Sequence, residues 1–203
     1  NGMVFCRNVQ FRYTPWQTAN GSRCVVALER PGASADQGDY ADRIQLQGVQ
    51  AHFPLPDISA HYRRVTDWGH FQIAGILRQM EWEDPNPVPI NLSGDDLGWG
   101  VNVSSNIKLG NNVLRLQVVY GEGIQNYMND APVDVGIEPN PGNPVQPIVG
   151  VALPMIGVVA FMDMNWSSRW TSTFGYSYLD NDNSVGQPAS AYKKGQYALA
   201  NLL

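Results

Sequence analysis

Apolar and polar residues alternate along most of this chain, and the alternation persists over long stretches. In residues 97–108 one set of alternate positions is almost wholly apolar and the other is small or polar. Successive side chains of a β-strand point to opposite faces, so this stretch predicts a strand with one apolar and one polar face. Comparable stretches lie at residues 5–13, 24–29, 58–63, 71–78, 114–120, 156–162, 171–178 and 193–203. No long run has apolar residues at helical spacing, so the pattern predicts an all-β fold of about nine strands.

The connections between these stretches alternate strictly between short and long. The short ones are residues 14–21, 67–69, 110–111 and 167–169, and the long ones are 31–57, 82–96, 121–154 and 180–192. Up-and-down strands with tight turns at one rim and long loops at the other produce this order, as in transmembrane β-barrels. A Greek-key sandwich does not sort its loops in this way. Strands of roughly ten residues also match a tilted bilayer crossing, whereas strands of soluble sheets are nearer five or six.

The charged residues are few and unevenly placed. They make up 15% of the chain, with a net charge of −5, and this acidic balance argues against a nucleic-acid partner, which requires a basic face. Most acidic residues fall in connections, whereas basic residues fall on the polar faces of the expected strands, namely Arg12, Arg63, Arg78, Lys108 and Arg115. In a barrel these faces line the lumen, and a cationic lumen favours anions. The alternative is a soluble sheet whose polar face carries solvated Arg and Lys.

Two features do not fit the simple pattern. Arg7 shares the apolar face of the first stretch, where contact with lipid costs about 2–4 kcal/mol at the bilayer midplane. A bulge, a position near the rim or a subunit interface would each account for it. Cys6 and Cys24 fall on opposite faces, and we expect Cys24 to lie opposite a residue near Phe11. A direct disulfide is therefore not expected, which leaves free thiols or an intermolecular bridge.

Four long strings resemble the DcaP-like porins of Gram-negative outer membranes. They are ALERPGASADQGDYADR (27–43), FPLPDISAHYR (53–63), GEGIQNYMNDAPVDVG (121–136) and KKGQYALANLL (193–203). The resemblance implies a porin-type β-barrel, an up-and-down antiparallel transmembrane barrel that in this family has sixteen strands. It also implies a homotrimer in outer-membrane lipid that takes up small anionic solutes such as dicarboxylates, with no cofactor and no catalysis.

The strand count departs from the family. Nine is odd, whereas single-chain bacterial barrels are even-numbered. The chain also lacks a closing strand with a terminal aromatic residue and the family's N-terminal helical extension. We therefore expect residues 1–203 to be a single β-barrel domain that is an internal segment of about half a porin. A lone half-barrel would expose two sheet edges, so the open alternatives are further chain, several copies that close one barrel, or a molecule outside the membrane.

The connection 31–57 is the candidate constriction. It falls in the third-loop region of the family, where porins commonly fold a loop into the lumen, and it contains Arg43 and His52. The competing interpretation is an ordinary strand, because Ile44, Leu46 and Val49 are interleaved with polar residues. Our hypothesis is that Arg43, with the arginines of the wall, binds solute carboxylates, since the guanidinium fork matches a carboxylate. The full expected pore lining is Arg12, Arg43, Arg63, Arg78, Lys108 and Arg115.

Two functions from different classes follow. The first is a passive outer-membrane channel for small anions. The second is a non-membrane binding or assembly module that uses the same strands. Catalysis is not expected, because the sequence contains no Gly-x-Ser-x-Gly elbow, phosphate-binding loop or dinucleotide fingerprint. The three histidines are nine residues apart, which is unlike metal-ligand spacing. Trp82, Trp99, Trp166, Trp170 and Tyr178 lie near expected strand ends, as interfacial girdles do, and the alternative is that they are packing residues of a soluble sheet.

Overall fold

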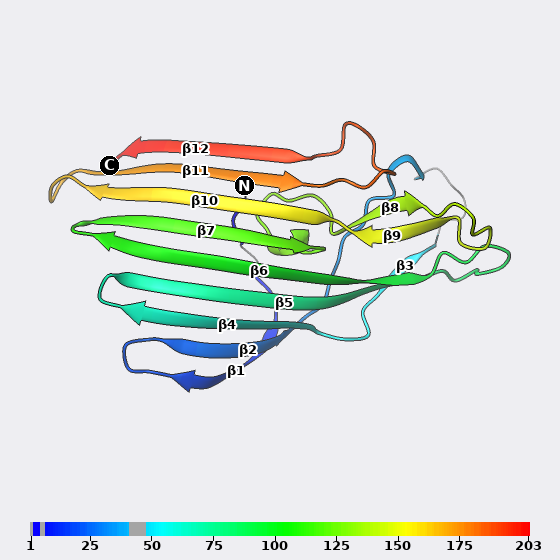
Figure 1. Cartoon of the computed structure of the whole chain (residues 1–203), viewed down its shortest axis with the longest axis horizontal. Coiled ribbons are helices and arrows are strands. Elements are labelled where there is room, and N and C mark those ends of the chain that lie inside the picture. The colour runs from blue at the N-terminus through cyan, green and yellow to red at the C-terminus, as the bar shows by residue number, and fades with distance from the viewer. Residues whose placement is uncertain (1, 5–6, 41–47) are drawn as a thin grey trace.

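The computed structural model describes residues 2–4, 7–40 and 48–203 and consists almost entirely of β-strands (Figure 1). Within these residues a ten-stranded sheet runs in the order β1-β2-β4-β5-β6-β7-β10-β11-β12, and β3 pairs with the end of β5. The nine ordered strands are β1 (Gln10–Gln17), β2 (Arg23–Glu29), β4 (Asp57–Thr66), β5 (Gly69–Glu83), β6 (Gly94–Leu109), β7 (Asn112–Glu122), β10 (Pro154–Asn165), β11 (Thr171–Asn181) and β12 (Lys194–Leu202). Every neighbouring pair is antiparallel, which confirms the nine expected strands.

The remaining elements are short. They are β3 (Gln50–His52), the hairpin of β8 (Val135–Pro139) and β9 (Ile148–Ala152), and the 3₁₀ turns η1 (Gly38–Tyr40) and η3 (Gln125–Tyr127). No helix among the described residues has the length and apolar character needed to cross a membrane. The first and last strands, β1 and β12, are not paired with each other, so the sheet is open.

The connections are sorted by length between the two ends of the sheet. Figure 1 shows the tight turns after β1, β4, β6 and β10 together at the left, and the long connections together at the right with β3, β8 and β9. We call these the turn end and the loop end. The central strands are long, with 15 residues in β5 and 16 in β6, which is more than the roughly 9–11 residues that a tilted bilayer crossing needs. The sorting predicted from connection lengths is therefore confirmed.

One face of the sheet, the outer face, is apolar and uncovered. The register places Val26 opposite Ala60, and Val118 opposite both Val103 and Val158, so apolar side chains form continuous rows across the strands. The large side chains of these rows are exposed, among them Phe11, Leu28, Ile58, Ile73, Leu77, Val101, Val118, Tyr120 and Phe174. A soluble monomer rarely exposes an apolar surface of this extent. The predicted apolar face is thus confirmed.

The other face, the inner face, carries the core. Val119, Met155 and Leu179 are buried there beneath the segment that follows β7, of which Ile124 and Met128 are also buried. Small residues on the wall allow this close approach. A Cβ added to Gly100 would lie 2.7 Å from Ile124 Cδ1, and one added to Gly121 would lie 2.9 Å from the same atom. Gly100 and Gly121 are opposite each other in β6 and β7, so together they form the seat for Ile124.

Three details differ from the sequence-based expectation or resolve it. Strand β1 begins at Gln10, so Arg7 lies before the strand and on neither of its faces. Cys24 lies on the outer face as expected but opposite Trp16, because the turn spans residues 18–22 and a bulge follows Tyr13. Its partner near Phe11 was therefore wrong, and Cys6 lies outside the described residues.

The aromatic residues at the strand ends divide between the two faces. Trp99 packs edge-on against Tyr120 on the outer face near the loop end, with ring centroids 5.7 Å apart, and Trp166 and Trp170 are exposed in the turn after β10. These positions suit an interfacial girdle. Trp82 does not: it shares the inner face with Met80, because they are two residues apart in β5, and it lines a cavity there. For Trp82 the girdle interpretation was wrong.

Candidate functional site

A band of polar and cationic side chains crosses the inner face in its turn-end half. Arg23 of β2 lies directly opposite Arg63 of β4, and the same row continues through Gln72, Ser104 and Gln117. Like charges directly opposite each other in a sheet are destabilising. Among the described residues neither arginine has a carboxylate partner, so this pair is kept at a cost to stability.

Several polar atoms of this band have no hydrogen-bond partner in the part of the chain that the structure describes. They are Nε of Arg23 and Arg63, Nε2 of His61, Oδ1 of Asn102 and Nε2 of Gln117, and each of these atoms is buried. Buried polar groups are nearly always hydrogen-bonded, and an unsatisfied one costs about 1–3 kcal/mol. Their concentration on one face indicates a surface built to hold water or a polar solute.

Further cations surround this band. Arg12 lies close enough to His61 to act on it electrostatically, together with Arg23 and Arg63. Arg63 and Arg115 stand in the same relation to His70. Positive charge on the inner face therefore extends from Arg115 near the turns through Arg63 and Arg23 to Arg12, which lies in the row of Ala27 and Ser59.

Nearer the turns the positive charge is partly balanced. Arg115 forms an ion pair with Asp163 at 2.6 Å, and both side chains are partly exposed. Lys108 is exposed one strand away, on the same row as Asp163. Arg12, Arg63, Lys108 and Arg115 thus all lie on the inner face, as their alternation predicts.

A cavity lies between the sheet and the segment that follows β7. It measures about 180 Å³, and its polar lining consists of Glu29, Ser59, His61, Asn102 and Tyr127. Two of the unpartnered atoms, on His61 and Asn102, belong to this lining. The cavity therefore places a space of solute size beside the cationic band, while Glu29 stands at its loop-end side, bound to the Ser59 hydroxyl.

Arg78 lies elsewhere. It is only 2% exposed, at the loop end of the inner face, and its Nε lies 3.0 Å from Asp57 Oδ2 while Nη1 lies 2.9 Å from Asp134 Oδ1. It also donates to the carbonyl oxygens of Gly123 and Gly32 and lies over the Tyr127 ring. The guanidinium is therefore occupied by the protein itself, and the expected solute contact of Arg78 is replaced by a buried ion-pair cluster.

The long connection after β2 crosses the inner face. Gly32 binds Arg78 of β5, Ala35 forms a bridge with Val135, and the Asp39 amide donates to the Gly186 carbonyl beyond β11. Figure 1 shows this blue segment passing behind the sheet. Within 48–56 only β3 is a strand, so the connection is a crossing segment with a short strand at its end. Arg43, the expected contact in the constriction, lies outside the described residues.

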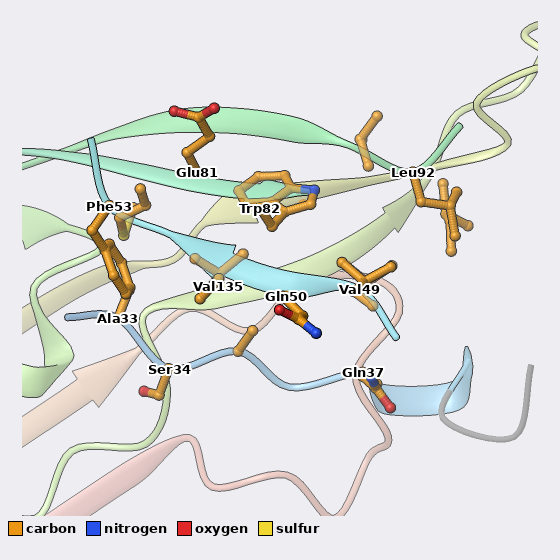
Figure 2. Close-up of a pocket in the computed structure, with 17 residues that line it drawn as sticks. Ala33, Ser34, Gln37, Val49, Gln50, Phe53, Glu81, Trp82, Leu92 and Val135 are labelled. Atoms are coloured by element: carbon orange, nitrogen blue, oxygen red, sulfur yellow. The ribbon is translucent and has the colours of Figure 1, made fainter. Parts of the chain in front are cut away.

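A second cavity, of about 150 Å³, lies at the loop end, and its lining is mostly apolar (Figure 2). Figure 2 shows Trp82, Val49, Leu92 and Val135 around it, with Gln37 and Gln50 at its margin. The indole of Trp82 packs on glycine: a Cβ at Gly150 would lie 2.6 Å from it. Among the described residues, no arginine or lysine belongs to this lining, so it differs in character from the cationic band.

Comparison with known proteins identifies the architecture. No family model and no curated protein sequence matches the chain. Among solved structures, the outer membrane channel DcaP of Acinetobacter baumannii superposes with a TM-score of 0.71 at 16% sequence identity. The alignment covers 95% of this chain and 50% of that one. The fold is that of part of a porin barrel. The chain spans about half the length of the channel it matches, which accounts for the open sheet.

Sequence reasoning missed two groups of residues. Arg23 has the same alternation as buried Val25 and Ala27, and this places it on the inner face with Arg63. It was overlooked although the signal was present. The partners of Arg78, Asp134 and Tyr127, come from a connection without alternation, and no local pattern marks them.

Proposed function

We propose that this chain forms part of the wall of an outer-membrane channel through which small anionic solutes, such as dicarboxylates, diffuse passively. The observation that carries the proposal is the opposed pair Arg23 and Arg63, which has no carboxylate partner among the described residues and lies on the face opposite the apolar surface. A bare cationic band is costly in a protein interior and useful in a water-filled lumen, where it concentrates anions. Arg12, Lys108 and Arg115 extend it along the same face.

The proposal includes location and assembly. The outer face would contact the hydrocarbon of the outer membrane, the turn end would face the periplasm and the loop end the exterior, as in other barrels of this kind. Likeness in fold to a named outer membrane channel supports this setting. The homotrimer implied by the resemblance belongs to the same proposal and is tested by the native mass of the detergent-solubilised protein.

Planar-bilayer recording of the complete channel that contains this chain tests the function. The reversal potential in a salt gradient gives the ratio of anion to cation permeability. We expect an anion-selective channel whose selectivity falls in Arg23→Gln and Arg63→Gln, while Arg64→Gln, on the outer face of the same strand, leaves it unchanged. Equal selectivity in wild type and both inner-face variants would refute anion binding by the band.

The second candidate, a non-membrane binding or assembly module, makes a different prediction. Such a module would remain monodisperse in buffer without detergent. The exposed apolar rows of the outer face argue against it, since water would contact Phe11, Val101 and Tyr120 alike. Size-exclusion chromatography with and without detergent separates the two.

A further inference from the structure

Arg78 connects four stretches of chain that are distant in sequence. Its guanidinium binds Asp57 at the start of β4, Gly32 in the crossing segment, and Gly123 and Asp134 in the connection after β7. With Arg78 in β5, two neighbouring strands of the wall and two inner segments meet at one side chain.

Asp134 extends this junction into the crossing segment. Its Oδ1, which binds Arg78, also accepts the Asn126 amide at 3.0 Å, and its Oδ2 accepts the Ser34 amide at 2.8 Å. The Tyr127 hydroxyl donates to Asp57 Oδ2 at 2.8 Å. Burial, together with this bond, raises the pKa of the Tyr127 phenol, so the hydroxyl remains a donor at working pH. Both carboxylate partners of Arg78 therefore bind an inner segment as well.

Within its described residues 32–40 the crossing segment has a single hydrogen-bonded attachment to the ordered strands, while the far end of the same connection pairs with β5 through β3. Among the described residues, Gly32–Tyr40 forms hydrogen bonds to the nine ordered strands only through Arg78. Its remaining bonds go to residues 126–135 and 186–187. The segment after β7 has a second attachment, the Gln125 amide on Asn181 of β11 at 2.7 Å. On the β4–β5 side both segments thus bind Arg78, and the Tyr127 hydroxyl on Asp57 and the pairing of β3 with β5 add to this attachment.

We infer that Arg78 is a positioning residue that fastens the two inner segments to the wall and thereby sets the width of the channel at its loop end. The inference rests on the proposed function, because it requires a conducting channel. Arg78 touches no solute in this role. A guanidinium is suited to it because it supplies five donors in a fixed plane, enough for two carboxylates and two carbonyls at once.

Single-channel recording of the complete channel tests the inference, with wild type, Arg78→Ala, Arg78→Lys and the control Arg64→Ala. Conductance rises with the open cross-section of a pore, so we expect Arg78→Ala to conduct roughly 1.5-fold more or above, with rapid fluctuations. Arg78→Lys should fluctuate as well, since one ammonium cannot replace the planar fork. Arg64→Ala should match wild type.

A reversible disulfide between the two inner segments provides a readout that is specific to their attachment. Ser34 Oγ and Asn126 Oδ1 lie 3.0 Å apart, on the two inner segments. In a background with Cys6 and Cys24 replaced by Ser, the pair Ser34→Cys and Asn126→Cys is introduced into Arg78→Ala. Oxidation should suppress the added fluctuations, because Gln125 still attaches one segment to β11, and a reductant should restore them.

The outcomes are distinguishable. Absence of channels in wild type overturns the proposed function. If the wild type forms channels and a correctly assembled Arg78→Ala has the same conductance and fluctuations, the positioning role alone is overturned. If Arg78→Ala does not assemble, Tyr127→Phe replaces it: this variant keeps the ring over Arg78 but loses the bond to Asp57. Fluctuations equal to wild type in Tyr127→Phe would then overturn the role.

Discussion

The loop-end and turn-end halves of the inner face are built from the same strands and treat their charges in opposite ways. At the loop end Arg78 is buried between Asp57 and Asp134, and each of its three guanidinium nitrogens donates a hydrogen bond. At the turn end Arg23 and Arg63 oppose each other with no carboxylate partner among the described residues. One half holds inner segments in place, and the other presents charge to whatever fills the lumen.

The difference shows that the face of the sheet on which a residue lies does not determine its role. Arg63 and Arg78 both alternate toward the inner face, so strand periodicity assigns them alike. What separates them is whether a connection from elsewhere in the chain covers them. A covered cation requires carboxylates, because an unpaired charge in a low-dielectric interior is strongly unfavourable. An uncovered one remains solvated and available.

The largest expected effect is on the free energy of unfolding, and it tests whether covered and uncovered arginines contribute differently to stability. Arg78→Met should lower the free energy of unfolding by about 3–5 kcal/mol, because it leaves Asp57 and Asp134 buried without their cation. Arg63→Met, its counterpart in the open half, should change stability little or raise it, since it relieves the repulsion with Arg23. Urea unfolding of the complete channel in lipid vesicles measures both. Equal losses in the two variants would remove the distinction between the halves.

The second effect is on ion selectivity, which should depend more on the turn-end half than on the loop-end half. The double variant Arg23→Gln and Arg63→Gln should lower the anion-to-cation permeability ratio by about two- to threefold per charge, on the order of 0.5 kcal/mol each in a water-filled lumen. The loss should shrink at molar salt, where screening acts within a few ångströms. Arg78→Lys is the matched comparison. This variant retains the positive charge at a buried site, so the selectivity of its channel should change less than that of the double variant. Reversal potentials at low and high salt provide the measurement.

The fold was largely predictable from sequence, and the inner segments were not. Alternation in residues 97–108 and in the other long stretches fixes strand number and face, because a side-chain period of two has a single geometric cause. The sorted connections fix the order of the strands. One neglected signal remained: Val119, Met155 and Leu179 are apolar on the predicted polar face, which implies a covering segment inside. The identity of that segment depends on contacts such as Arg78 with Asp134, which are separated by 56 residues and have no local pattern.

The third prediction concerns the seat of the inner segment. Gly100→Ala should destabilise the protein by about 1–3 kcal/mol, because the new methyl group would lie 2.7 Å from Ile124 Cδ1 and force it away from the wall. Gly32→Ala is the control, since nothing lies within 4 Å of its added Cβ and its carbonyl still accepts from Arg78. Urea unfolding compares the two. A Gly100→Ala protein as stable as the control would mean that Ile124 does not depend on this glycine.

The smallest expected effect lies at the turn end, where the open half contains an ion pair of its own. Arg115 and Asp163 lie 2.6 Å apart with both side chains partly exposed, and such pairs contribute about 0–1 kcal/mol to stability. Asp163→Asn should therefore leave stability nearly unchanged while it frees Arg115 and removes a negative charge from the lumen. Anion selectivity should rise slightly, opposite in sign to the loss in the Arg23 and Arg63 variants. The expected loss of stability is thus small at Asp163 and large at Arg78. Urea unfolding and reversal potentials of Asp163→Asn together test whether a carboxylate in the open half changes ion selectivity without stabilising the fold. The carboxylates of the covered half, in contrast, should stabilise the fold. A drop in stability comparable to that of Arg78→Met would show that the turn end is covered as well.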